Sequence, residues 1–457
     1  MAERTKKSVD YTRGPLFIPM IKFVIPVLFS NMFQQLYNTV DTMVIGHTLG
    51  ETSLAAIGAA TAIYDVLTGF AFGIGNGFSI VAARSYGSGE ISRLKKSVAS
   101  SIMAGLTVVV LITVVAFCTL MPFLRILNTP ENIIAESYAY ISVIVFFIGI
   151  MFLYNLCAGL LRAIGNSFAP LVFLIFSSFL NIILDVVFIR YWHMGIRGAA
   201  VATVIAQGCS VVLCLLYIWK KVKILIPQRS DFALDKNLYK ETITQGLALG
   251  FMECIVYAGG AVLQSAINSL GYLIVAGHTA ARRLFQAFLM PCSAMSATVN
   301  VFVSQNRGAD KVERIRKIMR YAYMNNAVMT LIITGIVFLF SDTLVFLISG
   351  SREAIIINNA SLYLRVAAPC YLLLSILGNT RAALQAIGRK ILPVLSSVIE
   401  LFGKIIFAMF LIPKLHYFAV VICEPIIWCF MLIELLTAFW LNPYIRQKRE
   451  YEGREEQ

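Results

Sequence analysis

The chain has 457 residues, of which 59% are hydrophobic and only 14% are charged. Soluble globular chains carry about 25% charged residues, so this composition excludes an ordinary soluble enzyme and indicates a membrane protein. The formal net charge is +14 at pH 7, but the basic residues are spread over short loops. They do not form a separate basic domain, so we expect no nucleic acid partner.

Apolar runs separated by short polar loops predict twelve transmembrane helices. In chain order the expected spans are 16–41, 53–82, 97–121, 132–158, 169–190, 197–219, 241–268, 272–300, 316–340, 354–380, 393–412 and 417–441. The polar residues before the first span lack the features of a signal peptide, so we expect that span to remain in the mature protein. Lysine and arginine concentrate before the first span and after the second, sixth, eighth, tenth and twelfth spans. By the positive-inside rule both termini are expected to be cytoplasmic.

The second half of the chain repeats the first. Gly87 and the basic cluster that follows it match Gly308 and its basic cluster, and at nearly the same offset 161–165 (LRAIG) matches 384–388 (LQAIG). Each copy holds six spans, an even number, so the repeats are parallel and related by an axis along the membrane normal. We therefore expect an all-α integral membrane protein of two six-helix bundles, related by a pseudo-two-fold axis, that face each other across a central cleft.

The repeat sets the expected domain boundaries. A cytoplasmic tail (1–15) precedes an N-lobe (16–219, spans one to six), and a cytoplasmic linker (220–240) leads to a C-lobe (241–441, spans seven to twelve) and a second tail (442–457). Nothing matches an ATP-binding phosphate loop, so energy is expected from an ion or substrate gradient or from a partner protein.

The first group of candidate functional residues lies in the N-lobe spans: Asp41, Asn181, Asp185 and Thr203. A carboxylate at membrane depth is costly and usually serves a function. Asn181 and Asp185 are four residues apart and share one helix face. The oxygen donors could bind a hard cation such as Na⁺, or two adjacent carboxylates could share a proton. The alternative is that both carboxylates only hydrogen-bond to neighbouring helices.

The second group follows one stripe of span seven: Glu253, Tyr257, Gln264 and Asn268. A carboxylate beside an aromatic ring suits an organic cation. The alternative is that Glu253 faces solvated headgroups. None of the three carboxylates has an acidic counterpart in the other repeat, because Asp41, Asp185 and Glu253 align with Val262, Ala408 and Met32.

Further charged residues lie within the C-lobe spans. Glu400 and Lys404 are four apart and are expected to form an ion pair. Arg282 and Arg283 require partners that the sequence does not identify, and the roles of Glu424 and Glu434 stay open. We expect His278 to take part in a helix contact, and the nine cysteines to be packing residues.

Three motifs resemble the multidrug and toxic compound extrusion (MATE) transporters: 38–42 (NTVDT), 84–89 (RSYGSG) and 181–185 (NIILD). The resemblance covers essentially the whole chain. It implies an antiporter that exports amphipathic, often cationic compounds in exchange for Na⁺ or H⁺. Asp41, Asn181, Asp185 and Thr203 match the N-lobe cation site of the branch that includes the DNA-damage-inducible type. The acidic residue that another branch carries on span ten is absent from 371–375 (YLLLS), so coupling is expected in the N-lobe.

We therefore predict a cation-coupled efflux antiporter of the plasma membrane that works by alternating access. It is expected to act as a monomer, to need no cofactor beyond the transported Na⁺ or H⁺, and not to be an enzyme. The alternative is a lipid-linked oligosaccharide flippase on the same scaffold, which Arg282 and Arg283 keep open.

Overall fold

The computed structural model describes residues 8–127, 129–233 and 235–447, and within them the chain is helical and contains no β-strand. The α-helices are α1 (Phe17–Leu49), α2 (Glu51–Gly87), α3 (Ile91–Ile126), α4 (Glu131–Phe146), α5 (Ile148–Ala163), α6 (Phe168–Asp185), α7 (Ile196–Lys221), α8 (Lys236–Asn268), α9 (Tyr272–Gly308), α10 (Val312–Ser349), α11 (Ala354–Ala386), α12 (Ile391–Ile406), α13 (Ile412–Leu415), α14 (Tyr417–Trp440) and α15 (Pro443–Arg446). Two π-helical segments, η1 (Val186–Tyr191) and η4 (Phe407–Leu411), follow α6 and α12, and two short 3₁₀ turns, η2 (Lys223–Leu225) and η3 (Arg229–Phe232), precede α8.

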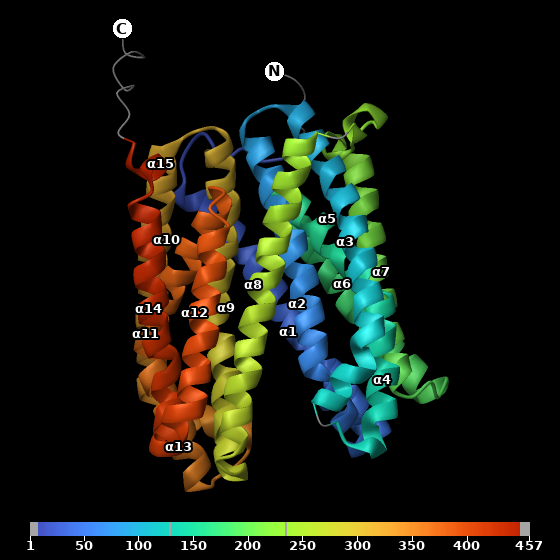
Figure 1. Cartoon of the computed structure of the whole chain (residues 1–457), viewed down its shortest axis with the longest axis vertical. Coiled ribbons are helices and arrows are strands. Elements are labelled where there is room, and N and C mark those ends of the chain that lie inside the picture. The colour runs from blue at the N-terminus through green and yellow to red at the C-terminus, as the bar shows by residue number, and fades with distance from the viewer. Residues whose placement is uncertain (1–7, 128, 234, 448–457) are drawn as a thin grey trace.

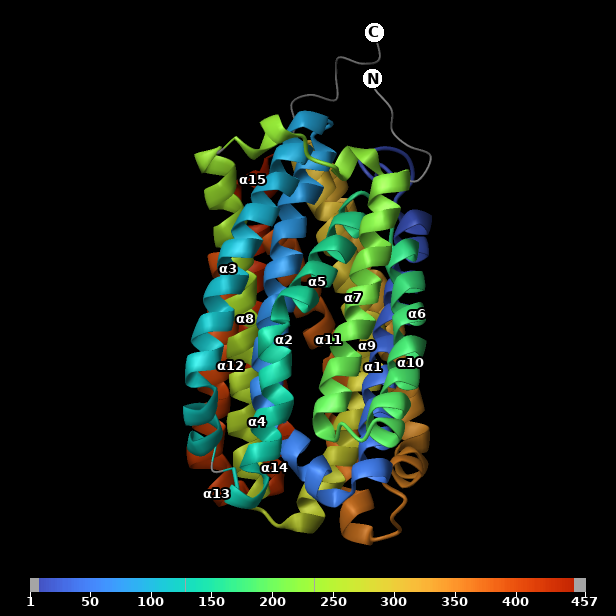
Figure 2. The same cartoon turned by 90° about the vertical axis from the view of Figure 1, so that its right-hand side faces the viewer.

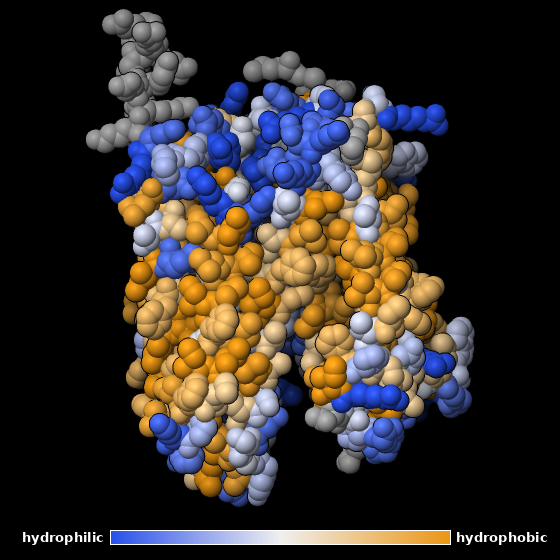
Figure 3. Space-filling model, viewed as in Figure 1, coloured by the Kyte–Doolittle hydropathy of each residue, from blue (hydrophilic) through white to orange (hydrophobic). Residues whose placement is uncertain are grey.

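The prediction of twelve transmembrane helices is confirmed. In the described chain, eleven helices are long and apolar enough to cross a membrane, and α4 and α5 meet at a bend of 47° and together form the twelfth. The expected fourth span, 132–158, covers this bent pair. The surface in Figure 3 has a broad apolar belt below a polar cap, as a bilayer-spanning protein requires.

The helices form the two expected bundles, α1–α7 in the N-lobe and α8–α14 in the C-lobe (Figures 1 and 2). Both ends of the described chain lie at the same end of the molecule, which we call the terminal face. The opposite end is called the open end. α1 is one of the helices that connect the lobes: it packs on α9, where the rings of Phe23 and Phe302 are 5.8 Å apart. α1 also packs on α6 of the N-lobe, where Asp41 meets Asp185.

Glycines let α2 and α8 approach closely in the half nearer the terminal face. A Cβ added at Gly77 would lie 2.6 Å from the Cα of Gly246, and one added at Gly73 would lie 2.7 Å from the backbone of Leu249. Such contacts are the usual means by which membrane helices pack tightly. Towards the open end the two helices separate, and Figure 3 shows the surface hollowed there between the lobes. We call this hollow the cleft.

The two halves also share an irregularity. The π-helical segments η1 and η4 occupy matching places in the repeat, each directly after the helix that follows the 161–165 or 384–388 motif. A π turn adds a residue to a helical turn and occurs often at functional sites. In the N-lobe it begins immediately after Asp185.

Candidate functional site

The N-lobe candidates come together where α1, α6 and α7 meet. Asn181 and Asp185 are fully buried, and Thr203 is 3% exposed. With its amide nitrogen turned to Asp185, Asn181 donates to Asp185 Oδ2 at 3.0 Å, and its oxygen accepts from the backbone N–H of Thr203 at 3.3 Å. Asp41 completes the group from α1. The four residues therefore form one site, which we call the N-lobe site.

The carboxyl groups of Asp41 and Asp185 lie within hydrogen-bond range of each other. Two ionised carboxylates at that range repel, so the arrangement favours a shared proton or a cation between them. In the described part of the chain, Oδ1 of each residue is buried without a hydrogen-bond partner. Such orphaned oxygens are available to a ligand.

The donors of the N-lobe site are all oxygens or amides, the kind that hard cations prefer. Among the described residues no three His, Cys, Asp or Glu side chains gather into a group that could hold a metal ion. With two carboxylates and neutral donors, the N-lobe site suits a monovalent cation or a proton better than a transition metal.

Tyrosines surround the N-lobe site. Tyr37 stands one turn before Asp41 on α1, and its hydroxyl donates to Thr203 Oγ1 at 3.4 Å. Tyr64 and Tyr140, whose rings are 6.5 Å apart, lie near Asp41. Sequence reasoning missed all three, although the i, i+4 spacing of Tyr37 and Asp41 was a usable signal.

The four candidates on α8 do not form one cluster. Glu253 lies midway along the helix, and the charges nearest to it are Arg381 on α11 and Glu400 on α12, inside the C-lobe. Tyr257 is 40% exposed. Gln264 and Asn268 are exposed further towards the open end, where Gln264 Nε2 donates to Asn268 Oδ1 at 2.8 Å.

Four of the remaining C-lobe charges form ion pairs inside the bundle. Arg282 pairs with Glu424 at 2.9 Å, and Glu424 also accepts from the Tyr363 hydroxyl at 2.8 Å. Lys404 pairs with Glu400 at 2.7 Å, which confirms the expected ion pair.

Three other C-lobe residues differ in their contacts. His278 is buried with Nδ1 3.3 Å from the Tyr417 hydroxyl, in the helix contact that we expected. Arg283 is exposed. Both carboxylate oxygens of Glu434 lack a hydrogen-bond partner within the described ranges.

Sequence reasoning also missed two charged residues. Asp65 lies on α2 within the expected second span, so the rule that identified Asp41 would have found it. Arg381 follows the expected tenth span by one residue, but α11 continues to Ala386 and carries Arg381 inside the bundle, where it donates to Ser396 Oγ at 2.8 Å.

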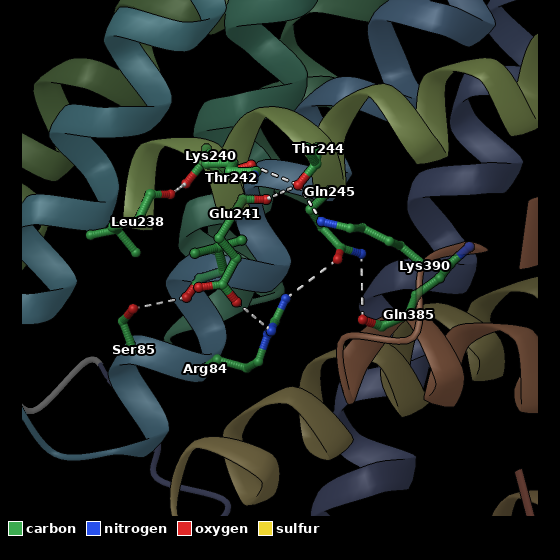
Figure 4. A network of polar contacts seen from close by, with 11 residues as sticks. Arg84, Ser85, Leu238, Lys240, Glu241, Thr242, Thr244, Gln245, Gln385 and Lys390 are labelled. Carbon is green, nitrogen blue, oxygen red and sulfur yellow. Dashed lines mark hydrogen bonds and ion pairs between the residues drawn. The ribbon is translucent and has the colours of Figure 1, made fainter. Parts of the chain in front are cut away.

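A polar network joins the lobes near the terminal face (Figure 4). Arg84 on α2 pairs with Glu241 on α8 at 2.6 Å and donates to Gln245 Oε1 at 3.4 Å. Gln245 Nε2 in turn donates to the backbone oxygen of Gln385 at 3.4 Å. We call these contacts the terminal latch, because they hold the lobes together at the end opposite the cleft.

Comparison with solved structures gives a matching fold. A transporter described as the outward-facing conformation of a multidrug resistance MATE family transporter superposes with a TM-score of 0.86. The match covers 96% of this chain and 98% of that one at 22% identity. A structure described as MATE in the bent conformation superposes with a TM-score of 0.85 and likewise covers 96% of this chain and 98% of that one.

Comparison of sequences identifies relatives in Bacillus subtilis (strain 168). The probable multidrug resistance protein YpnP is 30% identical over 319 residues, which are 68% of this chain and 69% of the relative. The probable multidrug resistance protein YoeA is 26% identical over 391 residues, 84% of each chain. The family model MatE matches twice, over residues 26–187 and 248–410, in agreement with the internal repeat. The chain therefore belongs to the MATE family, whose members are multidrug transporters and not enzymes.

Proposed function

We propose that this protein is an antiporter that exports amphipathic, often cationic compounds in exchange for Na⁺ or H⁺. The observation that carries the proposal is the pairing of Asp41 with Asp185 in a buried site of the N-lobe. Two carboxylates at this range bind a proton or a cation between them more readily than either would alone. The names of the relatives, which describe multidrug resistance or export, agree with drug efflux.

The position of α1 offers a route from ion binding to movement of the lobes. On α1, Asp41 meets Asp185 of α6, whereas Phe23 meets Phe302 of α9 in the C-lobe. Pro26 lies between Asp41 and Phe23 and removes one backbone hydrogen bond of the helix. Neutralising Asp41 and Asp185 removes their repulsion, so α1 can shift against α6 and carry the change to α9.

We propose alternating access between the state described here and one with the cleft open at the terminal face. From the positive-inside pattern we infer that the terminal face, and so both termini, would lie in the cytoplasm. The present state is then open to the outside and closed by the terminal latch. A rocking motion of two parallel six-helix repeats would exchange the two states.

The location, oligomeric state and substrate contacts of the protein are also part of this proposal. The protein would reside in the plasma membrane, act as a monomer and bind no nucleic acid. Tyr257 borders the cleft and Glu253 lies one turn away on the same helix, so both remain proposed contacts for the exported compound.

The test uses the full-length protein in liposomes loaded with a fluorescent organic cation. A Na⁺ gradient and a pH gradient are imposed in turn, and transport is followed for the wild type, Asp41→Asn and Asp185→Asn. We expect at least one of the two gradients to drive transport and each variant to lose that response. Normal gradient-driven transport by both variants would refute coupling at the N-lobe site, and movement of lipid-linked sugars alone would favour the flippase.

A further inference from the structure

Tyr257 lies at a close contact between α2 and α8. Cys254 Sγ lies 3.8 Å from the backbone oxygen of Val66, and a Cβ added at Gly69 would lie 2.3 Å from the ring of Tyr257. The Tyr257 ring therefore covers Gly69, yet the side chain is 40% exposed. Beyond this point the helices separate, so the ring forms part of the floor of the cleft.

Asp65 stands one helical turn from Gly69 on the same face of α2, towards the open end. Residues four apart lie above one another on a helix, so the Asp65 side chain lies beside the Tyr257 ring. The two groups interact electrostatically. Asp65 is half-buried, and over the described ranges its carboxylate takes part in no ion pair or side-chain hydrogen bond.

The space next to Asp65 is open. A Cβ added at Gly58 on α2 or at Gly260 on α8 would meet no atom within 4 Å. Thr61, one turn from Asp65, and Ala261, one turn from Tyr257, are both exposed. A carboxylate and an aromatic ring thus lie between two helices whose neighbouring positions towards the open end are small and uncovered.

The other acidic residues at membrane depth have charged or acidic neighbours within their own lobe. Asp41 and Asp185 face each other, and Glu253 and Glu434 both lie near Arg381 in the C-lobe. A carboxylate without a compensating partner at membrane depth is costly and calls for a cation. An aromatic ring adds cation–π attraction and a flat apolar contact.

We propose that Asp65 and Tyr257 bind the cationic group of the exported compound at the floor of the cleft. This proposal rests on the function proposed above and names the residues that would hold the charge of the exported compound. The N-lobe site would bind the coupling ion, and Asp65 would bind the exported cation. The two charges are then bound by different carboxylates.

The pair of Asp65 and Tyr257 has no chemical counterpart at the equivalent positions of the repeat. The register that sets Gly87 on Gly308 sets Asp65 on Gln286 and Leu36 on Tyr257. Gln286 and Leu36 are both exposed, but they supply neither a charge nor an aromatic ring. The cleft therefore attracts a cation to one side of the pseudo-two-fold axis. Gln286 also provides a matched control position.

The test measures equilibrium binding to the purified full-length protein without any ion gradient, so it does not depend on coupling. The probes are tetraphenylphosphonium, which is a cation, and triphenylphosphine oxide, which is neutral. In Asp65→Asn we expect the preference for the cation over the neutral probe to fall about tenfold. Asp65→Glu should retain the preference, and Tyr257→Leu should reduce it.

Two controls separate this effect from general damage. Gln286→Asn changes the position that is equivalent to Asp65 in the other repeat. Asp342→Asn removes a carboxylate whose side chain is 62% exposed and pairs with Arg365. Both should keep the wild-type preference. An unchanged preference in Asp65→Asn, or no preference for the cation in the wild type, would overturn the proposal. Loss of gradient-driven transport in Asp41→Asn with normal cation binding would leave both proposals standing.

Discussion

Gly87 at the end of α2 and Gly308 at the end of α9 occupy equivalent places in the two repeats, and each lies against the backbone of the other helix. A Cβ added at Gly87 would lie 1.9 Å from the Gln305 carbonyl oxygen, and one added at Gly308 would lie 1.9 Å from that of Arg84. Only glycine permits this approach. The pair therefore holds the lobes together at the terminal face, beside the terminal latch.

We expect Gly308→Ala to separate the lobes at the terminal face. The new methyl group would overlap the backbone carbonyl oxygen of Arg84, which cannot rotate away as a side chain could. The measurement is the distance between spin labels attached at Ser92→Cys on α3 and Arg389→Cys before α12, both exposed. The exposed native cysteines, Cys118 and Cys429, are first replaced by serine. The label distance should increase.

The matched control for this change is Gly335→Ala on α10. A Cβ at Gly335 would meet no atom within 4 Å, so the label distance should stay at its original value. An unchanged distance in Gly308→Ala as well would contradict the role of the glycine pair.

Glu241→Gln should loosen the terminal latch. Arg84 is 16% exposed and Glu241 33% exposed, so their pair is only partly screened by water. Partly exposed pairs contribute on the order of 1 kcal/mol, which would raise the fraction of lobe-separated molecules about fivefold. The same label pair measures this fraction. The exchange of both residues, Arg84→Glu with Glu241→Arg, should restore closure.

The control for Glu241→Gln is Glu313→Gln. Glu313 pairs with Arg316 on the same helix, α10, and within the described ranges it makes no ion pair to the N-lobe. If Glu313→Gln opened the terminal face as much as Glu241→Gln, loss of a surface charge would explain the effect, and the latch would not.

Glu424→Gln should lower the free energy of unfolding by roughly 3–5 kcal/mol, because it leaves Arg282 without its buried partner. Asp342→Asn breaks the exposed pair with Arg365 and should cost less than about 1 kcal/mol. Chemical unfolding in detergent micelles measures both. Equal losses in the two variants would mean that burial of the Arg282 pair adds no stability.

The fold was predictable because apolar runs and basic loops act over whole segments. The ends of the helices were less predictable, because helices continue beyond their apolar runs. The expected tenth span ends before Arg381, whereas α11 continues to Ala386 and carries Arg381 inside the bundle. The N-lobe site was predictable from the cost of Asp41 and Asp185 in lipid. The pairing of Arg282 with Glu424 was not, because the two lie on different helices and nothing local links their positions.

Thr203→Val distinguishes Na⁺ from H⁺ as the coupling ion. Valine keeps the shape of threonine at this 3% exposed position but removes the hydroxyl oxygen from the N-lobe site. Loss of one oxygen ligand should raise the Na⁺ concentration for half-maximal export about tenfold. Proton transfer between Asp41 and Asp185 does not use this oxygen, so export driven by a pH gradient should continue. The measurement is export from liposomes over a range of Na⁺ concentrations.

Thr298→Val is the matched control, since Thr298 is fully buried in the C-lobe and its hydroxyl donates only to the Ala294 carbonyl oxygen, at 2.9 Å. It should leave the Na⁺ dependence unchanged. Tyr37→Phe removes the hydroxyl that donates to Thr203 but leaves Thr203 Oγ1 in place, so it should have a smaller effect than Thr203→Val. Wild-type Na⁺ dependence in Thr203→Val would remove this hydroxyl from the ion site. Equal loss under both gradients would instead mean that Thr203 supports the packing of α6 on α7, because a lost Na⁺ ligand cannot impair proton-driven export.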